Sequence, residues 1–294
     1  MNDKTVIIIA GPTAVGKTAA AIRLAQRLRT KIISADSRQC FRELDIGVAR
    51  PSPAELLAVP HYFIASHSIH DQVNAAIFEE LALRWTDEIF HDHDAVVMVG
   101  GTGLYLQAFC EGLDTIPPVD APTKDKVQAG YEREGIGWLQ EQVRLADPGF
   151  YSSAEINNPR RLMRALEVIW STGESILSFR TRRKKQRPFQ IRKIGLQLPK
   201  EELHARIHQR VDRMIASGLP EEVKGLLPHR NCNALQTVGY TELFGWLDGR
   251  LTLPEASLEI KKNTRRYAKR QMTWFRKDPA IQWISPDQLP GIEF

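Results

Sequence analysis

Cysteine is scarce in this chain of 294 residues, which holds only Cys40, Cys110 and Cys232. They are far apart and odd in number, and none belongs to a C-x-x-C pair, so we expect neither a disulfide framework nor a cysteine zinc site. Long apolar runs are also missing, and a membrane-spanning helix needs about 20 apolar residues. A strand pattern starts at residue 5, so we expect no signal peptide. These absences predict a cytoplasmic protein without a membrane partner, and no feature demands more than a monomer.

Acidic residues are missing from two segments, 180–193 and 261–277, each of which holds eight Lys or Arg. The formal net charge of the whole chain is only +5, so the positive charge is concentrated there. Concentrated positive charge predicts a polyanionic partner such as RNA, although a basic segment is often only a solvated surface. In the second segment Tyr267, Trp274 and Phe275 alternate with the charges, which favours a surface that touches both phosphates and bases.

Residues 11–18, GPTAVGKT, match the phosphate-loop pattern G-x-x-x-x-G-K-T. The β-branched run at 5–10 predicts a buried strand before the loop, and the run at 19–28 predicts a helix after it. In that context backbone N–H groups and the helix N-terminus attract phosphate, Lys17 adds a positive charge, and the Thr18 hydroxyl is placed to hold Mg²⁺. The alternative is a glycine-rich turn that binds no ligand, but such a turn would not require a buried strand before it and a helix after it. The expected phosphate-binding residues are Gly11, Pro12, Thr13, Ala14, Val15, Gly16, Lys17 and Thr18.

The first third of the chain alternates strand and helix patterns, which is typical of a parallel sheet flanked by helices. A proline-rich polar segment, 114–122, ends this alternation, and the residues after it lack strand patterns. The sequence therefore predicts an α/β fold: a P-loop-type parallel sheet in a core of residues 1–113 and 190–294, interrupted by a helical insertion, 114–189. The clearest helix of the insertion is expected to begin at the N-cap Asn158. The expected strands are 5–10, 31–35, 61–65, 94–99 and 193–198.

The sequence does not show the second acidic motif that P-loop proteins use to hydrolyse nucleotides. Such proteins usually carry an acid after a second buried strand, where it helps to hold Mg²⁺, but the run at 95–99 is followed by Gly-Gly-Thr-Gly. The nearest acid at a strand end is Asp36. A small-molecule or nucleotide kinase, in which Asp36 deprotonates an acceptor hydroxyl, fits these residues. An RNA-binding protein with a purely structural phosphate loop fits them as well.

The chain contains six segments in this order: GPTAVGKT, SADSRQCFRELDIGVARP, VGGTGLYLQAFCEGL, NNPRRLMRALEV, TVGYTEL and KRQMTWFRK. Together they resemble the bacterial tRNA dimethylallyltransferase family. That family moves a dimethylallyl group from its diphosphate to N6 of the adenosine on the 3′ side of the anticodon, position 37, of tRNA. The resemblance implies that the phosphate loop holds a diphosphate leaving group rather than ATP. It also implies dimethylallyl diphosphate and the tRNA anticodon stem-loop as partners, and Mg²⁺ as cofactor.

The resemblance further implies roles for individual residues. Asp36 would be the general base, because a carboxylate can take the proton that the attacking amine sheds, and Lys17 and Thr102 would complete the catalytic group. Arg206 and Arg210, four residues apart on one predicted helix, could clamp the diphosphate, although a solvated stripe fits this spacing as well. The implied tRNA-binding residues are Asp36, Ser37, Arg38, Gln39, Thr102, Lys124, Arg160, Arg161, Arg164, Gln236, Gly239, Tyr240, Lys269, Arg270, Gln271, Trp274 and Arg276.

Overall fold

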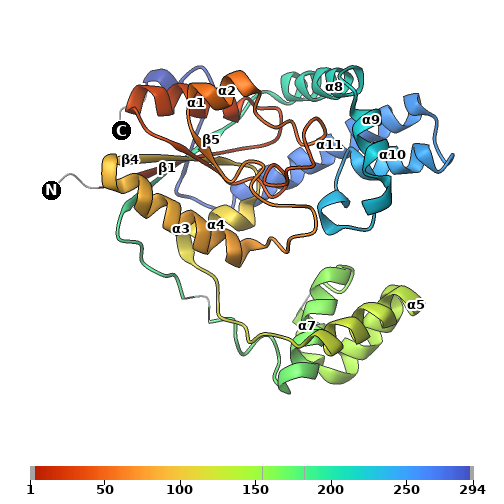
Figure 1. Ribbon diagram of the computed structural model, residues 1–294. Coiled ribbons are helices and arrows are strands. Elements are labelled where there is room, and N and C mark those ends of the chain that lie inside the picture. Colours follow the sequence, from red (N-terminus) through yellow and green to blue (C-terminus); the bar gives the residue numbers. More distant parts are fainter. Residues whose placement is uncertain (1–3, 154, 182, 292–294) are drawn as a thin grey trace. The chain divides into compact units, whose positions relative to one another are not determined.

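The computed structural model describes residues 4–153, 155–181 and 183–291 (Figure 1). The chain divides into two compact units, one formed by Met1–Glu111 with Gln186–Phe294 and the other by Gly112–Lys185. Each unit has a hydrophobic core of its own, which is the property that defines a domain. Within the described ranges, no helix is long and apolar enough to cross a bilayer.

The first unit is built on a six-stranded sheet in which every pairing is parallel, as the sequence predicts. The strand order is β3-β2-β4-β1-β5-β6. The two central strands β1 and β4 are almost completely buried runs of mainly β-branched residues, which suits a sheet covered on both faces. The strands are β1 (Thr5–Ala10), β2 (Ile32–Ser34), β3 (His61–Tyr62), β4 (Ala95–Gly100), β5 (Gln190–Leu196) and β6 (Ile281–Ile284).

Three strands differ most from the sequence prediction, while β2 and β4 are displaced by only one residue at each end. β3 is shorter than expected, because Phe63 and Ala65 take φ angles of 64° and 48° that a strand cannot hold. β6 was not predicted, since a run of four residues at the sheet edge is too short to show a clear pattern. β5 begins inside the basic segment 180–193, where the Lys193 ammonium lies 2.6 Å from the Asp278 carboxylate. Part of that segment is therefore structural rather than a free basic surface.

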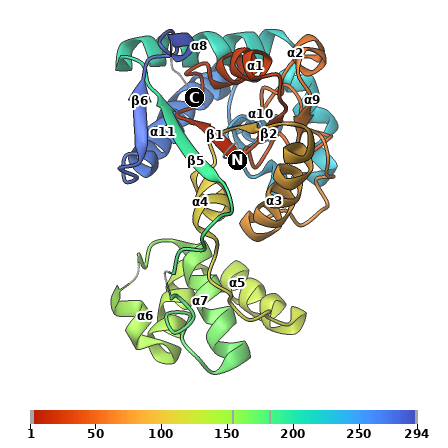
Figure 2. The same cartoon turned by 90° about the vertical axis from the view of Figure 1, so that its left-hand side faces the viewer.

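Helices cover both faces of the sheet (Figures 1 and 2). α1 (Lys17–Leu28) lies on one face, and α3 (Ala75–Asp92) and α4 (Gly103–Glu111) lie on the other. α3 begins after Asn74, whose side chain accepts the first free N–H groups of the helix. The remaining α-helices described in this unit are α2 (Pro53–Ala58), α8 (Lys200–Ala216), α9 (Leu219–Gly225), α10 (Tyr240–Leu247) and α11 (Leu253–Phe275).

The second unit is helical, as the sequence predicts. It contains α5 (Ala121–Ala146), α6 (Pro148–Ser153) and α7 (Pro159–Thr172). α5 consists of two helical stretches separated by a kink at Gly135, where φ is 75°. α7 begins after the predicted N-cap Asn158, whose side chain accepts a backbone N–H of the first turn. The core of this unit includes Val127, Leu139, Val143, Phe150, Leu162 and Leu166.

The carboxyl ends of three neighbouring strands meet at one edge of the sheet. Ala10 at the end of β1 pairs with Gly100 at the end of β4, and Ser34 at the end of β2 pairs with Val99 of β4. Because these strands are parallel, the loops that follow them lie side by side. Open α/β sheets bind ligands at such an edge. Here the three loops carry the phosphate loop, Asp36 and the Gly-Gly-Thr-Gly turn.

Candidate active site

The phosphate loop joins β1 to α1, and its backbone requires glycine at two positions. Gly11 has a φ angle of 144°, and a Cβ atom there would lie 2.7 Å from the Leu196 carbonyl oxygen of the neighbouring strand. Gly16 has a φ angle of 99° and precedes α1 in the left-handed conformation. The N-terminus of α1 therefore opens into the loop, where unpaired N–H groups and the helix dipole attract an anion.

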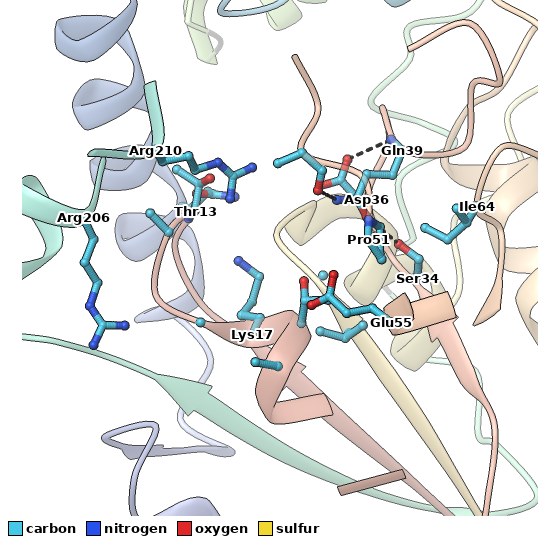
Figure 3. A pocket seen from close by; sticks show the side chains of 18 of the residues that line it. Thr13, Lys17, Ser34, Asp36, Gln39, Pro51, Glu55, Ile64, Arg206 and Arg210 are labelled. Atoms are coloured by element: carbon cyan, nitrogen blue, oxygen red, sulfur yellow. Dashed lines mark hydrogen bonds between the residues drawn. The ribbon is translucent and has the colours of Figure 1, made fainter. Parts of the chain in front are cut away.

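The loop lines a cavity of 470 Å³ (Figure 3). Figure 3 shows Arg206 and Arg210 at one end of this cavity and Ile64 at the other. A ligand with a charged head and an apolar tail would match such a distribution of side chains. The lining includes Thr13, Lys17, Thr18, Ser34, Asp36, Gln39, Ala49, Pro51, Ile64, Val99, Arg206, Arg210, Arg213, Tyr267 and Gln271.

Lys17 is the cation of the loop itself. Its ammonium donates to the Pro12 carbonyl oxygen at 2.7 Å. The pKa of Lys17 is lowered from 10.5 to about 7, mainly by burial; the Asp36 carboxylate opposes this shift, and the charge of Arg210 adds to it. Near neutral pH the amine is therefore only partly charged. A polyanion in the cavity would raise this pKa and hold Lys17 in its charged form, because an opposite charge favours the protonated state.

Three arginines of α8 line the same cavity. Arg206 and Arg210 are the pair expected from their four-residue spacing. Arg206 also pairs with the exposed Glu202, at 2.8 Å, whereas burial lowers the pKa of the Arg210 guanidinium. Arg213 was missed by the sequence reasoning, although its position three residues after Arg210 continues the same helix face and was a usable signal. The cavity thus has more positive charge than the sequence reasoning assigned to it.

Asp36 follows β2 in a turn that fixes its carboxylate. Its Oδ1 accepts the backbone N–H groups of Arg38 at 2.9 Å and Gln39 at 3.3 Å. In the described part of the chain, no group hydrogen-bonds the second carboxylate oxygen, and Asp36 lines the cavity. The Thr102 hydroxyl oxygen accepts the N–H of Ser37 at 3.1 Å, so the turn after β4 supports the turn after β2. This contact makes Thr102 a support of the Asp36 turn.

Gln39 is engaged within the protein. Its amide nitrogen donates to the carbonyl oxygens of Val48 at 3.2 Å and Ala49 at 2.9 Å, and its amide oxygen accepts the Ser34 hydroxyl at 3.4 Å. These bonds attach the turn after β2 to segment 45–51, which lines the cavity at Ala49. Gln39 therefore shapes the cavity wall, in addition to the nucleotide contact that the family resemblance implies.

The expected RNA-contacting residues of α11 and its C-terminus fall into two groups. Gln271 is buried, with 6% of its surface exposed. Its amide oxygen accepts the Thr13 N–H at 2.8 Å, and its amide nitrogen donates to the Gly101 carbonyl oxygen at 2.9 Å. An RNA contact by the Gln271 side chain, as the resemblance implies, would require breaking these bonds. The exposed group comprises Lys269, Arg270, Trp274 and Arg276.

The expected RNA contacts at 236–240 are only partly accessible. Gln236 is exposed, whereas Gly239 and Tyr240 are buried. The Tyr240 hydroxyl donates to the Glu222 carboxylate at 2.5 Å, and burial raises the pKa of this phenol. Glu222 also accepts two backbone N–H groups of segment 45–51. The Tyr240 side chain thus supports segment 45–51, and an RNA contact by this side chain, as the resemblance implies, would require a rearrangement.

The expected RNA-contacting residues of the second unit lie at its surface. Lys124 of α5 is exposed, as are Arg160 and Arg161 in the first turn of α7. Arg164, one turn further along α7, is half-buried. Arg161 pairs with the exposed Glu155 at 3.0 Å. Exposed ion pairs of this kind contribute little stability, so a phosphate could replace the carboxylate.

Oxygen atoms that line the cavity are suitable ligands for a magnesium ion bound together with a phosphate group. In the ranges that the structure describes, no group of three or more His, Cys, Asp or Glu side chains could hold a metal by itself. The Thr18 hydroxyl and the carboxylates of Asp36 and Glu55 line the cavity. Magnesium prefers such oxygen ligands and commonly takes only one or two from the protein, with phosphates and waters supplying the rest.

Comparison with known proteins places the chain in one family. Residues 39–278 match the family model described as IPP transferase. The chain is 46% identical over 284 residues to tRNA dimethylallyltransferase 1 of Bacteroides thetaiotaomicron, which covers 97% of this chain and 92% of that protein. It is 48% identical over 282 residues to tRNA dimethylallyltransferase of Christiangramia forsetii, which covers 96% of this chain and 93% of that protein.

Solved structures lead to the same family. The structure matches a tRNA isopentenylpyrophosphate transferase from Bacillus halodurans with a TM-score of 0.70 and 36% identity, over 96% of this chain and 90% of that chain. It also matches a eukaryotic dimethylallyltransferase acting on tRNA, with a TM-score of 0.79 and 25% identity, over 96% of this chain and 74% of that chain. With both its sequence and its fold in agreement, the chain belongs to the IPP transferase family.

Proposed function

We propose that this protein transfers a dimethylallyl group from dimethylallyl diphosphate to N6 of the adenosine at position 37 of tRNA, on the 3′ side of the anticodon, and releases diphosphate. The observation that carries the proposal is a single cavity that brings a phosphate loop and Arg210 together with the carboxylate of Asp36, in a member of the IPP transferase family. The proposal keeps the sequence-based expectation of a cytoplasmic monomer.

The cationic end of the cavity would receive the leaving group. As the allylic C1–O bond breaks, negative charge grows on the diphosphate, and donors already aimed at that charge lower the barrier. The backbone N–H groups of residues 14–18, Lys17 and the α8 arginines Arg206, Arg210 and Arg213 would act as these donors. A magnesium ion held by the Thr18 hydroxyl and the diphosphate oxygens would add Lewis-acid stabilisation of the same charge. The apolar end at Ile64 would hold the dimethylallyl group.

Asp36 would take the proton from the nucleophile. The adenine amine is a poor nucleophile because its lone pair is delocalised into the ring, so it must lose a proton as the N6–C1 bond forms. Oδ1 of Asp36 is held by two backbone N–H groups, and the other oxygen can accept that proton. A positioned general base is typically worth about 10²- to 10⁴-fold in rate. Asp36 would accept a proton from the adenine amine, whereas Lys17 would donate hydrogen bonds to the diphosphate.

The target adenine would have to leave its stack to reach this cavity. Enzymes that act on a base flip it out of the helix or loop. Contacts elsewhere in the complex offset the free energy of unstacking. The exposed residues Lys269, Arg270, Trp274 and Arg276 would supply such contacts in the first unit. Lys124, Arg160, Arg161 and Arg164 would bind the anticodon stem-loop from the second unit. Both units would therefore contact the tRNA, and only the first would also bind the diphosphate.

The test is transfer of label to RNA. Purified protein would be incubated with Mg²⁺, dimethylallyl diphosphate labelled in its allylic carbons, and an unmodified tRNA transcript. A matched transcript with guanosine at position 37 serves as the control. We expect label in the first RNA at N6 of adenosine 37, one diphosphate released for each adenosine alkylated, and no label in the control RNA.

A parallel incubation with γ-labelled ATP distinguishes the kinase alternative. Phosphate transfer from ATP to a small acceptor, without prenylation of tRNA, would replace the proposed reaction by a kinase reaction. Tight binding of tRNA without turnover of either donor would instead favour an RNA-binding protein whose phosphate loop is structural.

A further inference from the structure

Gln271 of α11 bridges two loops of the active site with one side chain. Its amide oxygen accepts the N–H of Thr13 in the phosphate loop at 2.8 Å. Its amide nitrogen donates to the carbonyl oxygen of Gly101, in the turn after β4, at 2.9 Å. The backbone donor and the carbonyl acceptor fix which end of the amide faces which loop. The phosphate loop and the Gly-Gly-Thr-Gly turn are therefore held at a set separation.

The turn after β4 is shaped to receive this amide. A Cβ atom on Gly101 would lie 2.2 Å from the Gln271 amide nitrogen, so a larger residue would displace the side chain. One helical turn further along α11, Trp274 packs in the same way against Gly103, where a Cβ atom would lie 2.2 Å from the indole ring. Gly101 and Gly103 stand after β4, where a nucleotide-hydrolysing P-loop protein usually has an acid. Because they lack side chains, α11 can pack closely against the turn after β4.

The contact reaches Asp36 through one more residue. Thr102 lies between the two glycines, and its hydroxyl oxygen accepts the N–H of Ser37, next to Asp36. Gln271 therefore links the loop that would hold the diphosphate to the turn that carries the base. In a displacement reaction the base, the nucleophile and the leaving group must be placed to within a fraction of an ångström, and a misplacement of about 1 Å can cost 10²-fold in rate.

On these contacts, and resting on the proposed function, we infer that Gln271 is a positioning residue of the transfer reaction. It sets the distance between the diphosphate cradle and the Asp36 carboxylate, and it does so from the helix whose exposed face carries Lys269 and Arg270. The family resemblance implies that Gln271 contacts tRNA, but both ends of its amide are occupied inside the protein. Its contribution should therefore appear in the chemical step and not in RNA affinity.

Gln271→Leu tests this role, because leucine keeps much of the volume and removes both hydrogen bonds. We expect kcat for tRNA prenylation to fall about 10²-fold, with the dissociation constant for tRNA unchanged. Gln282→Leu is the matched control: it makes the same chemical change at an exposed residue of the edge strand β6 and should leave kcat unchanged. Thermal unfolding of all variants shows whether the fold is retained.

Gln271→Glu provides a second readout that does not depend on the leucine variant folding. Its carboxylate keeps an acceptor for the Thr13 N–H but places an oxygen against the Gly101 carbonyl oxygen. Burial beside that carbonyl should raise the pKa of the new carboxyl, and its protonated form can again donate to Gly101. The ratio of variant to wild-type kcat should therefore rise as pH is lowered from 8 to 6. The leucine variant should show a constant ratio over the same range.

Two results would overturn the inference. One is a folded Gln271→Leu protein with wild-type kcat, and the other is a loss of rate that saturating tRNA restores in full, which would make Gln271 an RNA contact. A pH-independent ratio for Gln271→Glu would also count against it if the leucine variant does not fold. Prenylation by the wild-type protein in the same assay tests the proposed function separately, since that result does not depend on Gln271.

Discussion

Lys17 and Arg210 of the cavity differ from Arg160 and Arg161 of the second unit in how the protein surrounds them. Lys17 and Arg210 are half-buried, and burial lowers the pKa of both groups. Arg160 and Arg161 are exposed at the start of α7. A half-buried cation interacts more strongly with one anion at one place because less water screens it, whereas exposed cations attract a polyanion by releasing its counterions. The first arrangement suits a diphosphate, and the second suits the backbone of tRNA.

Removing the positive charge of Lys17 should have the largest effect on the rate of prenyl transfer. We expect Lys17→Met to lower the single-turnover rate of prenyl transfer by about 10²- to 10³-fold, the typical loss when one donor to a developing negative charge is removed. The affinity for tRNA, measured by filter binding, should not change. Lys269→Met is the matched control, with weaker tRNA binding but a normal rate at saturating tRNA. If both variants lost the same function, the contrast between the two kinds of cation would be wrong.

The pH dependence of donor binding should be the next largest effect. The pKa of Lys17 is about 7 in the free protein, and bound diphosphate should raise it. Affinity for the diphosphate should therefore fall by up to about tenfold per pH unit above pH 7, because binding then requires uptake of a proton. Calorimetry in buffers of different ionisation enthalpy measures this uptake. Lys17→Met should abolish it, and uptake that persists in this variant would assign the proton to another group.

Loss of the exposed arginines should have a smaller effect that depends on salt. We expect Arg160→Ala and Arg161→Ala each to weaken tRNA binding several-fold at low salt. Each should also reduce the slope of log affinity against log salt by about 1, as expected for one phosphate contact. The rate at saturating tRNA should stay the same. An unchanged slope for both variants would remove this part of α7 from the RNA-binding surface.

Tyr240→Phe should affect function least. The change removes the hydroxyl that donates to Glu222 inside the protein, which should lower the free energy of unfolding by about 1–2 kcal/mol. Chemical denaturation measures this loss. Because the Tyr240 ring is buried, the affinity for tRNA should remain at the wild-type value. Weaker tRNA binding by a folded variant would show that the Tyr240 hydroxyl contacts RNA.

The sequence predicts the parts of the site that depend on local pattern. The phosphate loop is one continuous motif between a strand and a helix, so its residues and their geometry can be anticipated together. The parallel sheet then brings the ends of β1, β2 and β4 to one edge, which places Asp36 near that loop. Arg213 was also within reach of sequence reasoning, because it continues the helix face of Arg206 and Arg210.

The remaining parts depend on tertiary packing, which a motif does not reveal. The segment KRQMTWFRK resembles an RNA-contacting block as a whole, yet Gln271 faces the phosphate loop while Lys269 and Arg270 face solvent. Tyr240 likewise belongs to a block expected to contact RNA but packs against segment 45–51. Which side of a helix faces the core is decided by residues far away in the chain. Such residues can be assigned only when the fold is known.

The most direct test of the account is the single-turnover rate of Asp36→Asn with saturating tRNA and donor. Asparagine keeps an oxygen that can accept the N–H groups of Arg38 and Gln39, but it cannot take a proton from the adenine amine. We predict a rate lower by about 10²- to 10⁴-fold, with unchanged dissociation constants for tRNA and for dimethylallyl diphosphate. A rate within a few-fold of wild type would show that Asp36 is not the base, and the central claim would fail.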